Sequence, residues 1–419
     1  MKTDKMGIIE ISTSNFLRTA ERLELPENIR NRLLRPKEKI EISLNPALPS
    51  GKLVNIQAFV VKHSDILGPA KGGIRMMEGV DLDDITGLAM DMTWKTALIG
   101  VPFGGGKSGI SYETTGLSPE DKETIIRSFT RGASRHFGPE LYIPAPDIGT
   151  NQTDMGYIRD CISYSSGTSI TKGCFVTGKP VILGGIVGRR DATGNGVIFS
   201  VIAACKKLGM NIKDCRVVVQ GFGNVGSVAA LSVAQAGAKV VGISDVGSGL
   251  YNPEGIDLKE ILRYLENHQM ISGYKNAEPV SNSELLELDC DILIPAAVQS
   301  QITRENATKI RAKIIAEGAN SPVTPDADKI LEDNGVLVIP DILCNAGGVF
   351  VSYLEYCQET QRTQMTEKEV ILQLETRMTD KFDEVYDYSQ KQKLAMRDSA
   401  MNLALYKINE GIQARGMLP

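Results

Sequence analysis

A glycine-rich turn near the middle of the chain constrains the fold more than any other feature of the sequence. The turn consists of Gly221, Phe222, Gly223, Asn224, Val225 and Gly226. An apolar strand candidate at 217–220 precedes it, and a helix candidate at 224–236 follows it. Backbone amides at such a turn, aided by the positive end of the helix dipole, can hold a pyrophosphate. The pattern therefore predicts a dinucleotide-binding site in an α/β fold.

An acidic residue stands where a dinucleotide site of this kind uses one. Asp245 follows a second strand candidate at 239–244, and a carboxylate there can accept hydrogen bonds from both adenosine ribose hydroxyls. The same carboxylate would repel a 2′-phosphate, and residues 246–249 supply no cation. We therefore expect NAD as the preferred cofactor, with NADP as the alternative. The competing interpretation of Asp245 is an ordinary turn residue before glycine.

The remaining pattern predicts an α/β protein of two domains. A chain of 419 residues exceeds one ordinary core. Strand candidates at 291–294, 313–316 and 336–339 alternate with helices, which indicates an open, mostly parallel, Rossmann-like sheet. Residues 1–45 are expected to be helical and 53–63 to be β-rich.

We place one domain boundary in the glycine-rich stretch around residue 185 and the other after residue 345, where the chain returns to helices. The first domain is expected to cover 1–185 together with C-terminal helices at 346–419, and the Rossmann-like domain 186–345. The C-terminal helices are predicted from apolar stripes with helical spacing.

Composition excludes several classes of function. The net charge of -5 and the pI near 5.5 argue against a nucleic-acid binder, which would carry a basic surplus. No apolar run is long enough to predict a membrane span, and the N-terminus has no apolar leader pattern. The seven cysteines lack Cys-x-x-Cys spacing and the three histidines are scattered, so we expect no metal site. Reduced thiols favour a cytoplasmic protein.

Three lysines stand out from the surface charges. Lys71 precedes Gly72 and Gly73, and Lys107 follows another run of glycines, so a small anion could approach the backbone beside each. Lys95 lies on the apolar stripe of a helix predicted from residue 81 onward, where a core residue is expected. Two lysines could neutralise a dicarboxylate, and the third, crowded by like charge, could act as a base. A solvated surface charge is the competing interpretation for each.

One acidic residue joins this group of candidates. Asp147 lies in the stretch 142–149, which its prolines predict to be a loop. It is a candidate for proton transfer, and an Asx-turn role is the competing interpretation.

Nine sequence blocks make the resemblance to a known family visible. They are GPAKGGIR (68–75), MTWKTAL (92–98), VPFGGGKSG (101–109), PAPDIGTN (144–151), TGKP (177–180), ATGNGV (192–197), QGFGNVG (220–226), AEGAN (316–320) and CNAGGVFVSY (344–353). With these blocks the chain resembles the glutamate dehydrogenases of the Glu/Leu/Phe/Val dehydrogenase superfamily, in their hexameric bacterial and archaeal form. The resemblance covers nearly the whole chain.

The resemblance implies roles for the substrate residues. Lys95 is expected to bind the α-carboxylate of L-glutamate, and Lys71 with Ser352 its side-chain carboxylate. Lys107 is the expected catalytic lysine, and Asp147 the residue that exchanges protons with the amine. Leucine and phenylalanine dehydrogenases carry an apolar residue at the Lys71 position, so glutamate is the expected substrate.

The resemblance also implies a cofactor environment and an assembly. Asn320 and Asn345 would lie near the nicotinamide and the substrate, and Thr193 near the carboxamide. The reaction implied is reversible oxidative deamination, with 2-oxoglutarate and ammonium as products. A homohexamer formed through the first domain is expected, without membrane or nucleic-acid partners.

Two departures from the family pattern leave alternatives open. Met76 and Met77 follow the GGIR block where the family has an aromatic residue or histidine and then proline, and Ile186 replaces a usual serine. An amino-acid dehydrogenase of other specificity is one alternative. A catalytically silent, nucleotide-binding regulatory subunit is the other.

Overall fold

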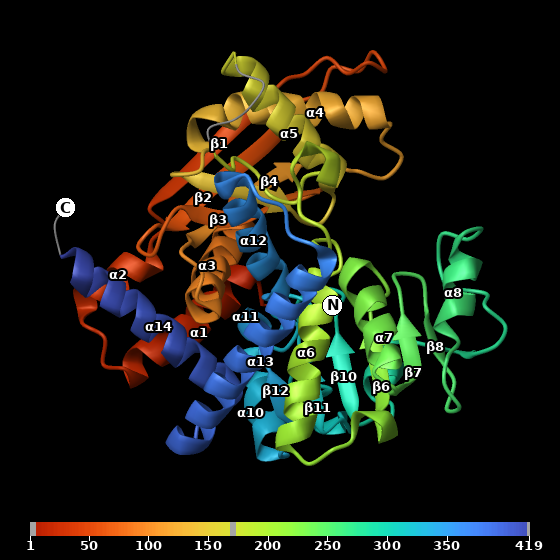
Figure 1. Ribbon diagram of the computed structural model, residues 1–419. Helices are drawn as coiled ribbons and strands as arrows, with labels where there is room; N and C mark the ends of the chain where they lie inside the picture. The colour runs from red at the N-terminus through yellow and green to blue at the C-terminus, as the bar shows by residue number, and fades with distance from the viewer. Residues whose placement is uncertain (1–5, 168–172, 417–419) are drawn as a thin grey trace. The chain divides into compact units, whose positions relative to one another are not determined.

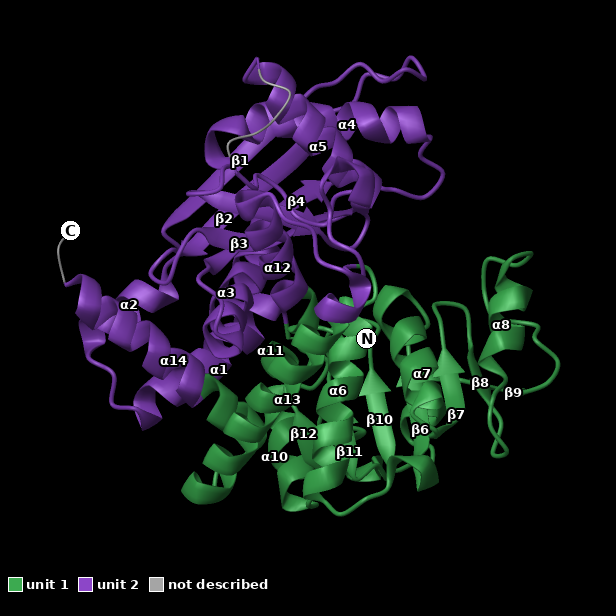
Figure 2. Cartoon of the chain, in the orientation of Figure 1, with its two compact units in different colours: residues 1–6, 190–348, 371–401 green, residues 7–189, 349–370, 402–419 purple. Residues whose placement is uncertain are grey.

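The computed structural model describes residues 6–167 and 173–416. The chain forms two compact units, each built around its own sheet (Figure 2). We call the unit of Gly7–Arg189, Val349–Val370 and residues 402–416 the five-strand unit. The other, the seven-strand unit, contains Met6, Arg190–Gly348 and Ile371–Met401. Figure 1 shows the helices and strands in chain order.

The five-strand unit packs helices on both faces of a mixed sheet. Its strands are β1 (Glu38–Leu44), β2 (Ile56–Ser64), β3 (Ala70–Met77), β4 (Gly104–Ser111) and β5 (Tyr142–Pro146), in the order β1-β2-β4-β3-β5. Its helices are α1 (Ile8–Arg22), α2 (Glu27–Leu34), α3 (Leu82–Ile99), α4 (Pro119–Ala133), α5 (Gln152–Ser165), most of α12 (Gly347–Gln361) and the larger part of α14 (Met396–Arg415). β3 runs parallel to both β4 and β5, whereas β2 is antiparallel to β1 and β4.

Two predictions for this unit are wrong. Residues 38–44, expected to be helical, form β1, whose alternation of half-buried and exposed residues is the period of a strand. The expected loop at 142–149 begins with strand β5, which lies at the sheet edge opposite β1. Pro144 and Pro146 fit there because an edge strand leaves one side of its backbone without ladder hydrogen bonds.

The glycine runs beside Lys71 and Lys107 are strands rather than loops. A Cβ on Gly72 would lie 1.7 Å from Gly106 O, and one on Gly105 would lie 2.0 Å from Thr93 Oγ1. Glycine at these places lets β3 meet β4 and lets β4 meet α3 without a side chain between them. Glycine is usually unfavourable in strands, so the sequence analysis predicted no strand at either run.

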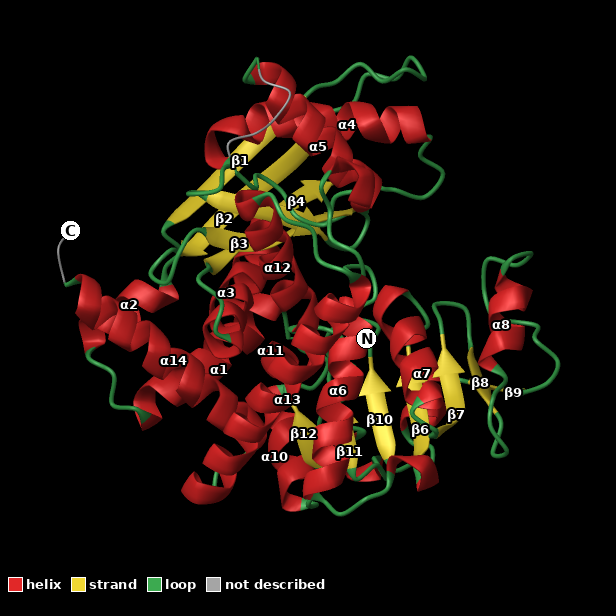
Figure 3. Cartoon of the chain, viewed as in Figure 1, coloured by secondary structure: helices red, strands yellow, loops and turns green. Residues whose placement is uncertain are grey.

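The seven-strand unit has the open, mostly parallel sheet that the sequence predicts. Its strands are β6 (Arg216–Gln220), β7 (Lys239–Ser244), β8 (Gly249–Tyr251), β9 (Glu278–Val280), β10 (Ile292–Pro295), β11 (Ile314–Ala316) and β12 (Leu337–Ile339), in the order β12-β11-β10-β6-β7-β8-β9. Its helices are α6 (Ala192–Lys207), α7 (Asn224–Gln235), α8 (Leu258–Leu265), α9 (Asn282–Leu286), α10 (Pro325–Asp333), α11 (Asp341–Cys344) and most of α13 (Glu367–Gln392). Figure 3 distinguishes these helices from the strands they pack on.

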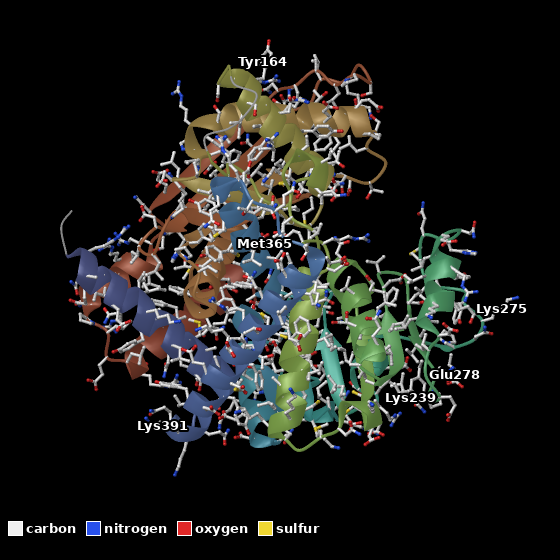
Figure 4. All side chains as sticks on the ribbon, viewed as in Figure 1. Tyr164, Lys239, Lys275, Glu278, Met365 and Lys391 are labelled. Atoms are coloured by element: carbon white, nitrogen blue, oxygen red, sulfur yellow. The ribbon has the colours of Figure 1, made fainter. Side chains whose placement is uncertain are left out.

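The unit division differs from the expected one in the C-terminal region. We expected all residues from 346 onward to return to the first domain, but Ile371–Met401 group with the seven-strand unit. The apolar stripe of α13 explains this, because Leu374 lies close to Gly347 and Met378 close to Gly196 on α6. Exposed side chains such as Lys391 on α13 and Tyr164 on α5 point outward (Figure 4).

Neither membrane spans nor disulfides contribute to the described structure. Within residues 6–167 and 173–416, none of the helices combines the length and apolar character needed to cross a bilayer. All seven cysteines are free thiols.

Candidate active site

Four charged residues project from one face of the five-stranded sheet. Register pairs Lys71 of β3 with Gly105 of β4 and with Ile143 of β5. Because side chains alternate between faces, Lys71, Arg75 and Lys107 share the face that α3 covers. Asp147 directly follows β5 in the same alternation. The opposite face packs against α4 and α5 through an apolar core that includes Ile74, Phe129 and Ile158.

Lys107 and Asp147 form a buried ion pair on this face. Lys107 Nζ contacts Asp147 Oδ2, and both side chains are largely excluded from solvent. Arg75 lies on the strand between them, with its Nε 3.7 Å from the same carboxylate oxygen. Two cations thus share one carboxylate, which leaves the group with a positive surplus.

Burial and charge shift both pKa values downward. Burial lowers the pKa of Lys107, and the neighbouring charges of Arg75 and Lys95 lower it further, although Asp147 opposes them. Burial alone would raise the pKa of Asp147, but the charges of Lys107 and Arg75 outweigh burial and hold the pKa below its usual range. Asp147 is therefore ionised, and Lys107 loses its proton more readily than an exposed lysine.

Backbone and hydroxyl contacts hold Asp147 in place. Its amide donates to Thr150 Oγ1 at 2.9 Å, and its Oδ1 accepts from the Ile148 amide at 2.7 Å. Thr150 in turn donates to the carbonyl of Ile74 on β3 at 2.8 Å. The turn after β5 is thereby tied to the adjacent strand, so the carboxylate orientation is fixed by the sheet.

Lys95 lies near the C-terminal end of α3, the helix that covers this face. Its side chain is buried, with 5% of the residue exposed, as the apolar stripe of this helix predicts. The helix begins at Asp81, whose side chain accepts from the Asp84 amide, and ends at Gly100 in a left-handed conformation. Lys95 lies close enough to Lys107 for its charge to lower the pKa of Lys107.

A second group of polar residues consists of two cations, Lys71 and Arg189, and the hydroxyl of Ser352. Arg189 Nε donates to Ser352 Oγ on α12 at 2.8 Å. Burial and the charge of Arg189 lower the pKa of Lys71 to about 7. Arg189 thus contacts Ser352 and acts through its charge on Lys71, and the joint role of Lys71 and Ser352 stays a prediction.

Sequence reasoning assigned no role to Arg189. The glycine-rich run that ends at Arg189 could have marked it as a functional residue. Its hydrogen-bond partner Ser352, however, lies far away in the sequence. Burial lowers the pKa of the Arg189 guanidinium, so this buried cation lacks full charge compensation. Arg75 was missed in the same way, since it lies within the GGIR block without a recognisable partner in the sequence.

In the seven-strand unit, the glycine-rich turn lies at the reversal point of the strand order. β10 and β7 flank β6 on opposite sides, so the carboxyl end of β6 adjoins the switch between the two halves of the sheet. A Cβ on Gly221 would lie 2.9 Å from Ala296 O, just beyond β10. A Cβ on Gly226 would collide with Gly221 O at 1.8 Å. The turn can close this tightly only with glycine at these two positions.

The start of α7 fits a pyrophosphate. The helix begins after Gly223 without a side-chain cap, so a side chain does not occupy its first backbone amides. A Cβ on the exposed Gly223 would meet no atom within 4 Å. Phe222 is buried, whereas Asn224 is exposed. Residues 221–226 therefore form a tight turn before α7 with Gly223 and Asn224 exposed, and pyrophosphate binding there stays a prediction.

Asp245 lies at the end of β7, but three backbone amides already bind its carboxylate. Oδ1 accepts from Gly247 at 2.8 Å and from Ser248 at 3.0 Å, and Oδ2 accepts from Ile271 at 2.7 Å. A carboxylate has about four acceptor positions. Asp245 therefore organises the turn by accepting from these three amides. Its Oδ2 atom retains acceptor capacity for a ribose hydroxyl.

Asn345 and Asn320 lie together beyond the ends of the strands. Asn345 Nδ2 donates to Asn320 Oδ1 at 3.2 Å and to the Ala319 carbonyl at 3.0 Å. The Oδ1 atom of Asn345 is buried without a hydrogen-bond partner. A buried free acceptor of this kind calls for a donor from a ligand. Thr193 lies in the first turn of α6, within the same unit.

Comparison with known proteins decides the family. The Glutamate/Leucine/Phenylalanine/Valine dehydrogenase family profile matches residues 184–416, and the profile described as "Glu/Leu/Phe/Val dehydrogenase, dimerisation domain" matches residues 36–164. The chain belongs to the Glu/Leu/Phe/Val dehydrogenase family.

Relatives within the Glu/Leu/Phe/Val dehydrogenase family match almost end to end. A glutamate dehydrogenase of Thermotoga maritima is 41% identical, with 99% of both chains covered. A cryptic catabolic NAD-specific glutamate dehydrogenase of Bacillus subtilis is 38% identical, covering 99% of this chain and 97% of the relative. The hetero-hexameric glutamate dehydrogenase of Thermus thermophilus, in a Leu-bound form, superposes with a TM-score of 0.92 at 34% identity, covering 97% of this chain and 98% of that one.

The departures from the Glu/Leu/Phe/Val dehydrogenase pattern are mostly buried. Met76 packs in the core on the sheet face opposite the lysines, and its amide donates to the Ile148 carbonyl at 2.8 Å. Met77 is 42% exposed at the end of β3, and Ile186 is buried. The altered residues therefore leave the Lys107–Asp147 pair and the Arg189–Ser352 contact formed.

Proposed function

We propose that this chain catalyses the reversible, NAD-dependent oxidative deamination of L-glutamate to 2-oxoglutarate and ammonium. The observation that carries the proposal is the buried Lys107–Asp147 pair on a sheet face that also bears Lys71 and Arg75. A surplus of buried positive charge suits a substrate with two carboxylates. The near full-length similarity to glutamate dehydrogenases supports the same conclusion.

Two separate cationic groups support the assignment of the substrate ends. Lys95 would bind the α-carboxylate, close to the catalytic pair. Lys71 and Ser352, joined by Arg189, would bind the side-chain carboxylate. Both Lys71 and Arg189 have lowered pKa values because they are buried. An aliphatic side chain would leave their charges unpaired and desolvated, which disfavours leucine as a substrate.

Lys107 is the proposed base. Because its pKa is lowered, chiefly by burial, the Lys107 amine loses its proton more readily than an exposed lysine does, and the neutral amine would then activate water for attack on the iminium carbon. Asp147, held ionised, would take the proton from the substrate amine and return it to ammonia. The backbone contacts of Asp147 keep its carboxylate oriented while the proton moves.

The residues of the seven-strand unit fit NAD. Residues 221–226 would hold the pyrophosphate, Asp245 the adenosine ribose, and Thr193, Asn320 and Asn345 the nicotinamide end. When bound, NAD accepts the hydride that leaves the substrate Cα. The carboxylate of Asp245 supports NAD over NADP because it would face a 2′-phosphate with like charge.

Assembly and compartment form a further part of the proposal. A hexamer is supported by the hetero-hexameric relative from Thermus thermophilus and by the dimerisation-domain match at 36–164, and we propose that six copies of this chain form it. We assign substrate binding and oligomerisation to the five-strand unit, and cofactor binding to the seven-strand unit, which includes Ile371–Met401. The free cysteines are consistent with a cytoplasmic location.

Product analysis in the reverse direction tests this function. The protein is incubated with 2-oxoglutarate, NADH and ¹⁵N-ammonium, and the amino-acid product is identified by mass spectrometry. Formation of ¹⁵N-labelled L-glutamate in equal amount to the NADH consumed is expected. An NADH-binding protein that forms no labelled glutamate would instead be a silent regulatory subunit.

A further inference from the structure

A buried lysine lies in the five-strand unit outside the residues assigned to chemistry. The Nζ of Lys179 contacts Glu355 Oε1 at 2.7 Å, Glu359 Oε2 at 2.8 Å and the Val176 carbonyl at 2.6 Å. The side chains of Lys179 and Glu355 are both 0% exposed. A fully buried charge pair is costly to form, so this one calls for an explanation beyond general stability.

Glu355 places a negative charge beside the proposed side-chain carboxylate site. It follows Ser352 by one helical turn on α12, and therefore lies on the same side of that helix. Its charge raises the pKa of both Lys71 and Arg189, partly offsetting their burial. The Glu355 carboxylate therefore acts electrostatically on both cations of the proposed side-chain carboxylate site.

The Lys179 side chain and the backbone amides of Gly178 and Lys179 all donate to that carboxylate. Glu355 Oε1 accepts from Lys179 Nζ, and Oε2 accepts from the Gly178 amide at 2.8 Å. Lys179 pairs with Glu355 at 2.7 Å, whereas the described residues show no ion pair of Glu355 with Lys71 or with the half-buried Arg189. Lys71 and Arg189 are therefore available to another anion.

We propose that Lys179 is a positioning residue for substrate specificity. By binding Glu355, it keeps that carboxylate away from Lys71 and Arg189 and so leaves them available for the side-chain carboxylate of the substrate. This inference rests on the proposed function. Without Lys179, Glu355 pairs with Lys71 or Arg189, and the protein itself occupies the anion site.

Steady-state kinetics of three variants test whether Lys179 keeps the Glu355 carboxylate away from Lys71 and Arg189. The variants are Lys179→Met, Glu355→Gln and the double variant, each measured with L-glutamate and with L-norvaline, which lacks the side-chain carboxylate. Lys179→Met is expected to raise KM for glutamate about tenfold or more, since a freed buried carboxylate competes for the site. KM for NAD and kcat/KM for norvaline should stay within about twofold, because neither involves that carboxylate.

The double variant separates charge from structure. Removing the Glu355 charge in the Lys179→Met background should return KM for glutamate to within about threefold of wild type. A loss of packing would not be rescued by a second substitution in the same cluster, and it would affect norvaline as well. If Lys179→Met does not fold, the double variant decides, because it removes the buried Glu355 charge and leaves only Glu359, whose side chain is 14% exposed, without Lys179 as a partner.

Lys122→Met is the matched control. Lys122 pairs with the buried Asp154 at 2.8 Å in the same unit, on the face that α4 and α5 cover. It should leave KM for glutamate unchanged. Glutamate turnover by wild type with unchanged KM in Lys179→Met, or a double variant that stays impaired, would overturn the inference. A wild-type protein without glutamate turnover would overturn the proposed function instead.

Discussion

Lys107 on β4 and Asp147 after β5 form an ion pair across the intervening strand β3, whose Arg75 lies 3.7 Å from the same carboxylate. Three neighbouring strands therefore supply one residue each. The arrangement keeps Asp147 ionised and lowers the pKa of Lys107. The strand order therefore brings Lys107 and Asp147 together as an acid–base pair. It also places the positive charge of Arg75 beside them.

Lys107→Ala should abolish most turnover while preserving cofactor binding. Removing a positioned base lowers kcat by about 10²–10⁴-fold. The measurement is steady-state kinetics with glutamate, paired with NADH binding by fluorescence. Lys37→Ala, which removes an exposed lysine paired with Asp65, is the control and should leave kcat unchanged. Near-normal kcat in Lys107→Ala contradicts the assignment.

Binding of glutarate should weaken as the pH rises through about 7. Burial lowers the pKa of Lys71 to about 7, so the free enzyme has this lysine mostly protonated below that pH and mostly neutral above it. Glutarate has two carboxylates and no amine, so its own charge is constant in this range. The measurement is its inhibition constant between pH 6 and 8.5. A flat profile would show that Lys71 does not bind the carboxylate, and Lys71→Met should give that flat profile.

Asp245→Ser should reduce the preference for NAD and also destabilise the seven-strand unit. The substitution removes the charge that opposes a 2′-phosphate, so the ratio of kcat/KM for NAD to that for NADP should fall. It also takes away the acceptor for the Gly247, Ser248 and Ile271 amides, at a cost of about 1–3 kcal/mol for each one left buried and unsatisfied. Kinetics with both cofactors and a thermal melt check the two effects. An unchanged cofactor ratio with a lowered melting temperature would mean that Asp245 only organises the turn.

Arg397→Met should destabilise the seven-strand unit, and more so at high pH. Arg397 binds Glu317 and Asp328 and lies 3.5 Å from Asp341, so it is the counter-charge for three carboxylates. Removing one partner of a buried ion pair costs about 3–5 kcal/mol. Burial already raises the pKa of Glu317 to about 8 despite Arg397, and the variant raises it further.

The sign of the pH effect follows from these pKa values. A carboxyl whose folded pKa exceeds its unfolded value binds protons more tightly in the folded state, so stability falls as the pH rises through the folded pKa. Urea unfolding of Arg397→Met at pH 6 and pH 8.5 should show the larger loss at pH 8.5. The exposed Arg311→Met is the control. An equal loss at both pH values would mean that the carboxylates gain no proton when Arg397 is absent.

Local patterns predicted the seven-strand sheet well because strand, turn and helix alternate along the chain. The expected strand at 239–244 coincides with β7, and the helix expected at 224–236 ends one residue later than α7. Lys95 was found because a charge on the apolar stripe of α3 breaks a periodic pattern. Signals of this kind depend only on neighbouring residues.

Contacts between distant segments were not predictable. Arg189 with Ser352, and Lys179 with Glu355, join residues far apart in the sequence, and no periodicity records their partners. The strands β3 and β4 were missed for a different reason. Their glycines permit close packing of backbone on backbone, a tertiary requirement that overrides the low strand propensity of glycine.

We expect the chain to oxidise glutamate with NAD in preference to NADP. The most direct measurement is absorbance at the reduced-nicotinamide band, with purified protein and each combination of glutamate or leucine with NAD or NADP. Reduction with glutamate and NAD, faster than with glutamate and NADP, is the predicted result. Reduction with leucine but not with glutamate, or no reduction with either despite bound cofactor, would contradict the account.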